Sequence, residues 1–211
     1  MKIHRAPVLT LTLLMTAIAL YGLAPDPALL YFNAAHIRGG ETWRLLTGHF
    51  MHADIGHLFW NGLGLAVLGS IIEHRSRALC LTALGAGIAA VSILLMTPFA
   101  QLDYYCGLSG VLNTLLLVAI WQEWRATRSW LVILIAAGCF AKVVVEVLQG
   151  TSILTNISWP PYAWSHLAGL AGGLVVVCAA GTPASAAELT YRHADEPIGT
   201  VRVHPLTGYF E

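Results

Sequence analysis

Charged side chains are scarce in this 211-residue sequence. Lys, Arg, Asp and Glu make up 10% of it and hydrophobic types 57%, whereas a soluble domain carries about 25% charged residues. The mean hydropathy is +0.69, so too few polar side chains remain to cover a water-exposed surface. The composition excludes a soluble globular domain and predicts a polytopic membrane protein.

An excess of positive charge is also missing. Eleven Lys and Arg residues balance eleven Asp and Glu residues, which excludes nucleic-acid binding as a first hypothesis. Paired cysteine motifs are missing too, because Cys80, Cys106, Cys139 and Cys178 show no C-x-x-C spacing. They suggest neither a disulfide framework nor a zinc knuckle, and we expect buried free thiols.

Long apolar windows are what the sequence does contain. A membrane-spanning helix needs about 20 mostly apolar residues, and six such windows occur, at 7–24, 55–72, 78–97, 107–121, 130–148 and 163–180. The fourth is short unless it extends through Trp124. A cleaved signal peptide competes for the first window, but this window exceeds the about 7–15 residues of a signal-peptide core. We therefore predict an all-α bundle of six transmembrane helices.

The distribution of basic residues predicts the orientation. If six helices alternate, eight of the eleven basic residues fall on one side: Lys2, Arg5, Arg75, Arg77, Arg125, Arg128, Arg192 and Arg202. The positive-inside rule makes this side and both termini cytoplasmic. The loops at 25–54, 98–106 and 149–162 then face outward. Residues 1–180 form the membrane domain, and 181–211 are expected to form an exposed cytoplasmic tail.

Four polar residues are expected near the outer ends of three helices. His57 and Asn61 lie four residues apart at the start of the second helix, hence on one face. Ser109 lies just inside the outer end of the fourth helix, and His166 just inside the outer end of the sixth. At a rise of 1.5 Å per residue, all four lie within roughly 10 Å of the outer surface. Because intramembrane polar residues are costly, this shared depth predicts a functional site.

Glycines beside these residues allow close helix packing. Gly107 and Gly110 flank the serine, and Gly169 and Gly173 follow the histidine. Small residues let helix backbones approach, and a serine nucleophile must lie about 2.6–3.2 Å from its base. Taken singly, the serine is more often a backbone-bonding hydroxyl, the histidine a packed donor and the glycines ordinary packing. Together they favour a nucleophile and its base.

Two other kinds of site are weaker hypotheses. His49, His52 and His57 suggest a metal, but H-E-x-x-H is absent and only Asp54 offers a nearby carboxylate. Lys142 and Glu146, four residues apart in the fifth window, suggest ion transport. No second intramembrane acid or inverted repeat supports this. We expect the two charges to pair or to face a polar interior.

Over about residues 40–180 the sequence resembles the rhomboid family of intramembrane serine proteases. The matching motifs are Trp43-Arg44, His52 followed by His57 to Asn61, Glu73, Gly107-Leu-Ser-Gly110, and His166 with Gly169 and Gly173. The resemblance implies Ser109 as nucleophile and His166 as base, with His57, Asn61 and the Ser109 N–H forming an oxyanion hole. Trp43, Arg44, Glu73 and the glycines would be structural.

The rhombosortase branch is similar in further features. These are the short length, the run Tyr104-Tyr-Cys-Gly-Leu-Ser-Gly-Val111 and the fifth-helix Lys142 and Glu146 followed by Gly150. The resemblance implies processing of proteins that carry a C-terminal Gly-Gly sorting segment. Two departures concern His166. Asn113 replaces the aromatic residue on which the histidine ring stacks in many rhomboids, and Ser165 stands where alanine is common.

The expected reaction is acyl transfer by a Ser-His dyad, because the second, fourth and sixth helices carry no acid at this depth. We expect no cofactor and no metal, and membrane-anchored proteins as substrates. The expected location is a bacterial inner membrane, with the site toward the periplasm. An inactive client-binding relative and a general rhomboid protease without a sorting role are the alternatives.

Overall fold

The computed structural model describes residues 6–151 and 162–181. These residues form α1 (Val8–Leu23), η1 (Pro27–Leu29), α2 (Ala34–Arg38), α3 (Arg44–Phe50), α4 (Ile55–Arg75), α5 (Arg77–Leu95), α6 (Ser109–Thr127), α7 (Trp130–Gln149) and α8 (Trp164–Gly181). Within these ranges no β-strand forms, and one isolated antiparallel bridge joins Phe32 to Tyr105. The all-α prediction is confirmed.

A long helix occupies each of the six predicted windows. By length and composition, α4, α5, α7 and α8 qualify as candidate membrane spans among the described residues, and α1 is a shorter apolar helix of 16 residues. The integral, multi-pass character is therefore confirmed, whereas the count of six spans stays a prediction. The fourth window does extend past Trp124, to Thr127. The short helices η1, α2 and α3 within 25–54 were not predicted.

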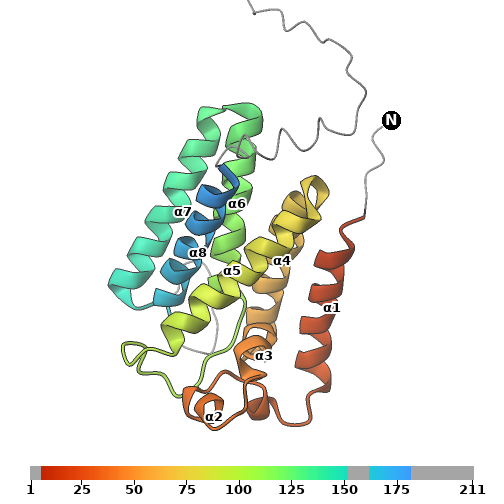
Figure 1. Cartoon of the computed structure of the whole chain (residues 1–211), viewed down its shortest axis with the longest axis vertical. Helices are drawn as coiled ribbons and strands as arrows, with labels where there is room; N and C mark the ends of the chain where they lie inside the picture. The colour runs from red at the N-terminus through yellow and green to blue at the C-terminus, as the bar shows by residue number, and fades with distance from the viewer. Residues whose placement is uncertain (1–5, 152–161, 182–211) are drawn as a thin grey trace, which may run out of the picture. The chain divides into compact units, whose positions relative to one another are not determined.

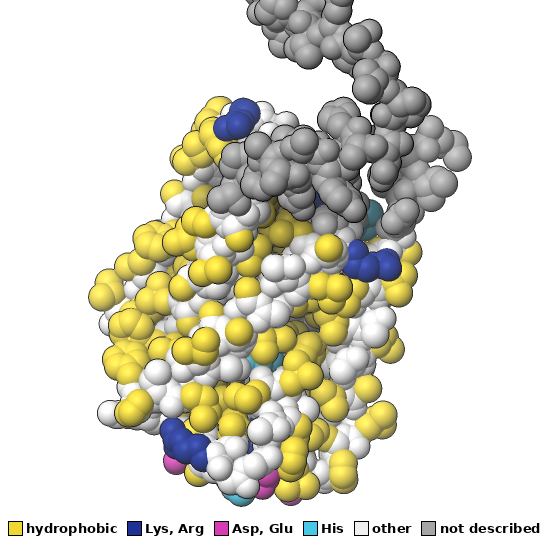
Figure 2. All heavy atoms as spheres, viewed as in Figure 1, with side chains coloured by type: hydrophobic (Ala, Val, Ile, Leu, Met, Phe, Trp, Pro, Cys, Tyr) yellow, Lys and Arg dark blue, Asp and Glu magenta, His cyan; other side chains and the backbone are white. Residues whose placement is uncertain are grey.

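The outer surface of the bundle is apolar. Figure 2 shows hydrophobic side chains over much of the visible face, with Lys, Arg, Asp and Glu side chains away from its middle. On α7 only Val143 and Glu146 are buried, and its exposed side chains include Leu131, Ile135 and Phe140. Such a helix suits lipid contact, because a water-exposed helix would carry a polar outer face.

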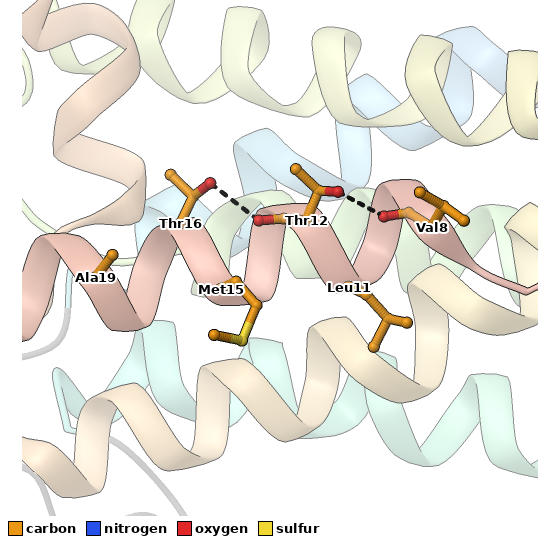
Figure 3. Close-up of a pocket in the computed structure, with 6 residues that line it drawn as sticks. All are labelled: Val8, Leu11, Thr12, Met15, Thr16 and Ala19. Atoms are coloured by element: carbon orange, nitrogen blue, oxygen red, sulfur yellow. Dashed lines mark hydrogen bonds between the residues drawn. The ribbon is translucent and has the colours of Figure 1, made fainter.

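The two exposed threonines of helix α1 form their hydrogen bonds within the helix. Its exposed side lines a shallow pocket (Figure 3), where Thr12 donates to the Val8 carbonyl at 2.8 Å and Thr16 to the Thr12 carbonyl at 2.9 Å. A hydroxyl bonded to the preceding turn leaves no unpaired donor. This arrangement makes α1 compatible with lipid despite its threonines.

The helices that carry the predicted site residues all start at one end of the bundle. In Figure 1, α4, α6 and α8 begin at the end that also bears α2 and α3, and α7 finishes there. The shared depth inferred from the sequence therefore corresponds to a shared end of the bundle.

At the opposite end, Glu73 near the end of α4 caps the first turn of α1. Its carboxylate accepts from the Leu9 N–H at 2.9 Å, and from the Thr10 N–H and hydroxyl at 2.8 and 2.9 Å. Arg77 donates to it at 3.1 Å. The first N–H groups of a helix have no intrahelical acceptor, so a carboxylate there is stabilising.

The chain separates into a unit at Met1–Ala179 and a second unit at Ala180–Glu211. The predicted tail at 181–211 lies outside the described residues except for Gly181. The boundary and role of this tail remain predictions.

Replacing Glu73 with alanine should loosen α1 from α4. We expect a loss of about 1–3 kcal/mol, because the buried N–H and hydroxyl of Thr10 lose their acceptor, and a Tm several degrees lower in detergent. Glu123→Ala is the matched control, since its ion pair with Arg75 is about one-third exposed and should contribute little. An unchanged Tm for the Glu73 variant would contradict the capping role.

Candidate active site

The segment before α6 places the serine. Gly107 adopts φ +113°, a left-handed conformation that favours glycine. Its N–H donates to the Gly48 carbonyl at 3.0 Å, which ties the segment to α3. Ser109 then starts α6, and no side chain caps this N-terminus. As at any helix N-terminus, the first-turn N–H groups of α6 have no intrahelical acceptor.

His57 and Asn61 of α4 lie directly against Gly107. A Cβ on Gly107 would stand 2.5 Å from His57 Nε2 and 3.3 Å from Asn61 Nδ2. Both side chains are buried, and Asn61 Nδ2 has no hydrogen-bond partner among the described residues. An unsatisfied buried donor is rare and calls for an explanation. Here the donor packs against Gly107, which lies two residues before the serine in the chain.

The start of α4 has a local cause. Asp54 accepts a hydrogen bond from the His57 N–H at 2.7 Å, which caps the helix. His52, just before this cap, packs its ring edge-to-face on His57 with centroids 5.0 Å apart. The cap and the neighbouring ring hold His57 at the beginning of the helix.

His52 itself is neutral. Burial, and then the nearby His57, lower its pKa to about 3, so its Nδ1 carries a proton toward the Phe50 carbonyl at 3.0 Å. Burial likewise lowers the pKa of His49 to about 4, and its Nε2 lies 3.0 Å from the Ser92 hydroxyl on α5. Each histidine thus makes one side-chain hydrogen bond, while His49 Nδ1 and His52 Nε2 have no partner among the described residues. In 6–151 and 162–181 no group of three His, Cys, Asp or Glu side chains is arranged to hold a metal.

Helix α8 contacts α6 through glycine. A Cβ on Gly169 would stand 1.8 Å from the Gly110 carbonyl oxygen, which means that the two backbones touch. Thr114 of α6 donates to the Gly169 carbonyl at 2.6 Å. One turn further, a Cβ on Gly173 would meet the Thr114 carbonyl at 3.1 Å. Because Gly110 adjoins Ser109 and Gly169 lies three residues after His166, this contact brings the serine and histidine segments together.

A carboxylate from α7 holds the histidine ring. Glu146 Oε2 lies 3.0 Å from His166 Nδ1, and Lys142 donates to Oε1 at 2.5 Å. In the part of the chain that the structure describes, no hydrogen bond joins Ser109 to His166.

Sequence reasoning missed this carboxylate because it considered acids only on the second, fourth and sixth predicted helices. A signal was present. Glu146 lies three residues before the end of α7, and His166 lies two residues after the start of α8. Since consecutive helices run in opposite directions, these positions fall at the same depth.

Two departures from the rhomboid pattern have visible consequences. Asn113 does not support the His166 ring as an aromatic residue would, because its Nδ2 donates to the Ser109 carbonyl at 2.8 Å. Ser165 is buried and its hydroxyl has no hydrogen bond of good geometry among the described residues. Its backbone oxygen and Cβ instead pack against Gly110. The small side chain thus contributes to the close approach of α8 and α6.

Tyr105 contacts the segment that leads into the serine. It is buried, and burial raises its pKa to about 12 although the neighbouring Ser165 and Ser109 hydroxyls oppose the rise. Its hydroxyl donates to the Gly107 carbonyl at 3.2 Å. This contact helps to keep Gly107 in its left-handed conformation.

The Trp43-Arg44 pair lies in the first loop. Arg44 is buried and donates to the Ala28 and Tyr31 carbonyls at 2.6 and 2.8 Å and to Glu41 at 2.6 Å. Trp43 is half-exposed and donates to the Leu29 carbonyl at 3.3 Å. The arginine therefore cross-links the loop, while the indole lies on its surface.

These features define a class, namely a multi-pass membrane protein with a serine, two histidines and an unsatisfied amide gathered at one end of its helices. Residues 39–182 match the family of the Rhomboid domain. The chain belongs to the rhomboid family. It is 29% identical over 154 residues to rhomboid protease GluP of Bacillus subtilis (strain 168), a match that covers 72% of this chain and 28% of GluP. The chain thus spans less than a third of that relative.

The contact between α6 and α8 predicts that even one methyl group on Gly169 is damaging. The Cβ in Gly169→Ala would overlap the Gly110 carbonyl, so the helices must separate. A shift of about 1 Å can cost about 10²-fold in rate, and Gly169→Val should abolish cleavage. Gly85→Ala is the control, because a Cβ there meets nothing within 4 Å. Cleavage of a transmembrane reporter, normalised to protein level, measures both. Wild-type cleavage by Gly169→Val would refute the placement of His166 against Ser109.

Proposed function

We propose that this protein is an intramembrane serine protease in which Ser109 is the nucleophile and His166 the base. The observation that carries the proposal is the convergence of three helix starts. Gly110 touches Gly169, and Gly107 touches His57 and Asn61. Membership of the rhomboid family supports the same activity.

The reaction follows from these positions. Ser109 Oγ bonds to the substrate carbonyl carbon while its proton passes to His166 Nε2, the ring nitrogen that Glu146 does not occupy. The proton then goes to the leaving amine as the peptide C–N bond breaks. Water hydrolyses the acyl-enzyme and releases the free serine and a new carboxyl terminus.

Negative charge on the carbonyl oxygen needs donors. Asn61 Nδ2, His57 and the N–H of Ser109 are the proposed oxyanion hole. Donors placed before the reaction stabilise developing charge without reorganisation, and one such donor contributes about 10²–10³ in rate. The unpartnered state of Asn61 Nδ2 supports this assignment.

The proposed substrates are proteins anchored in the membrane, cut near its outer face. We further propose six spans with both termini in the cytoplasm, supported by the side on which the basic residues fall. The corresponding location is a bacterial inner membrane with the site toward the periplasm. The finer proposal is a rhombosortase that processes Gly-Gly C-terminal sorting segments, supported by the sequence resemblance described above.

Labelling with a serine-reactive fluorophosphonate tests the nucleophile. The wild-type protein should label in membranes, and Ser109→Ala should abolish the label, whereas Ser70→Ala on α4 should not. Labelling that survives Ser109→Ala would refute the assignment. No labelling of the wild type would favour an inactive, client-binding relative.

The assignment of Asn61 to the oxyanion hole predicts that Asn61→Ala, unlike Ser109→Ala, loses cleavage but keeps fluorophosphonate labelling. Cleavage should fall about 10²- to 10³-fold, while fluorophosphonate labelling stays detectable because the nucleophile is intact. Val67→Ala, on the exposed side of α4, is the control for a truncated side chain on this helix. Equal cleavage by the Asn61 variant and the wild type would exclude Asn61 as a donor.

The sorting role has its own test. A reporter ending in Gly-Gly, an apolar helix and a basic tail should be cleaved, and one whose two glycines are replaced by leucine should not. Equal cleavage of both reporters would leave a general rhomboid protease. Ser109→Ala must abolish either cleavage.

A further inference from the structure

We propose that Glu146 is a positioning residue for His166, so that the catalytic unit is Ser109–His166–Glu146 with Lys142 holding the carboxylate. This inference deepens the proposed protease function and rests on it. It assigns to α7 an indirect part in the chemistry, through the His166 ring.

The contact is buried and specific. The side chains of Glu146 and His166 are 1% and 8% exposed, and Oε2 lies 3.0 Å from Nδ1. The other oxygen, Oε1, receives the Lys142 ammonium, whose side chain is about one-third exposed. A carboxylate inside a membrane domain is costly unless it is paired. Its position on the ring of the proposed base is therefore not explained by packing alone.

The hydrogen bond to Glu146 favours one tautomer of the His166 ring. A carboxylate accepts hydrogen bonds, so the bond to Glu146 keeps the proton on Nδ1 and leaves Nε2 as an acceptor for the Ser109 proton. When that proton arrives, the imidazolium forms next to a negative charge. The carboxylate thereby orients the base and stabilises the charge that the reaction creates.

The contact with Glu146 also takes the place of an aromatic residue that would support the His166 ring. Asn113 stands where many rhomboids place an aromatic residue, and its amide is engaged with the Ser109 carbonyl. In this chain the His166 ring is held by a hydrogen bond from the neighbouring helix. The ring is thus oriented through its edge at Nδ1 instead of through its face.

Because Lys142 binds one oxygen of Glu146, replacing the other oxygen by an amide nitrogen changes which nitrogen of His166 carries the proton. In Glu146→Gln the ammonium of Lys142 retains the amide oxygen, because an ammonium only donates. The amide NH₂ then faces His166 and donates to Nδ1, which moves the ring proton to Nε2. In that form the ring accepts no proton from Ser109, although size and packing are unchanged.

The experiment measures kcat and KM for a transmembrane reporter in liposomes, together with fluorophosphonate labelling. We expect Glu146→Gln to lower kcat by about 10²- to 10⁴-fold, with little change in KM or Tm. Glu146→Asp should recover part of the rate because it restores a carboxylate. Glu123→Gln, the same change at an ion pair on α6, should behave as wild type.

The double variant Lys142→Met/Glu146→Gln separates positioning from packing. Without the ammonium the amide can present its oxygen to Nδ1, so the double variant should be more active than Glu146→Gln alone. ¹⁵N spectra of the histidines in the wild-type protein should also show His166 protonated at Nδ1, and at Nε2 in Glu146→Gln. This spectroscopic measurement does not depend on activity.

Three results would overturn the inference, namely wild-type kcat in Glu146→Gln, His166 protonated at Nε2 in the wild type, or a double variant no more active than Glu146→Gln. With labelling still abolished by Ser109→Ala, these results would leave the protease function standing. Labelling that survives Ser109→Ala would instead overturn the proposed function itself.

Discussion

The contact of two backbones at Gly110 and Gly169 is the constraint on which the site depends. No side chain fits between them, because a Cβ on Gly169 would stand 1.8 Å from the Gly110 oxygen. A serine has a short side chain, so the proposed base must be brought close by the helices themselves. The hydrogen bond from Thr114 to Gly169 fixes the register of this contact. Ser109 and His166, which flank it, are positioned as a result.

Buried carboxylates link helices at both ends of the bundle. Glu73 on α4 receives the first N–H groups of α1, and Glu146 on α7 receives Lys142 and the ring of His166. Inside a membrane domain an unpaired charge is costly, so each carboxylate is tolerated only where neighbouring donors pair with it. One acid joins two helices structurally, and the other joins α7 to the proposed catalytic base.

Much of the fold could be predicted from the sequence, because lipid imposes a simple rule on composition. Apolar windows of about 20 residues predicted all six long helices, and α1, for example, lies within one residue of its window at each end. The short helices η1, α2 and α3 of the first loop were not predicted. Their positions depend on distant partners, such as the buried guanidinium of Arg44, which binds the Ala28 and Tyr31 carbonyls.

For the site, residue types and their spacing were enough to predict which polar residues are available and at what depth. Residue spacing and helical rise placed His57, Asn61, Ser109 and His166 at one end, and glycine spacing indicated where helices approach. The packing of the helices decides which nitrogen of the His166 ring carries no hydrogen bond within the described part of the chain and which acid is proposed to orient the ring. That decision depends on the rotation of α7 against α8, which side-chain packing sets, and no spacing within either helix encodes it.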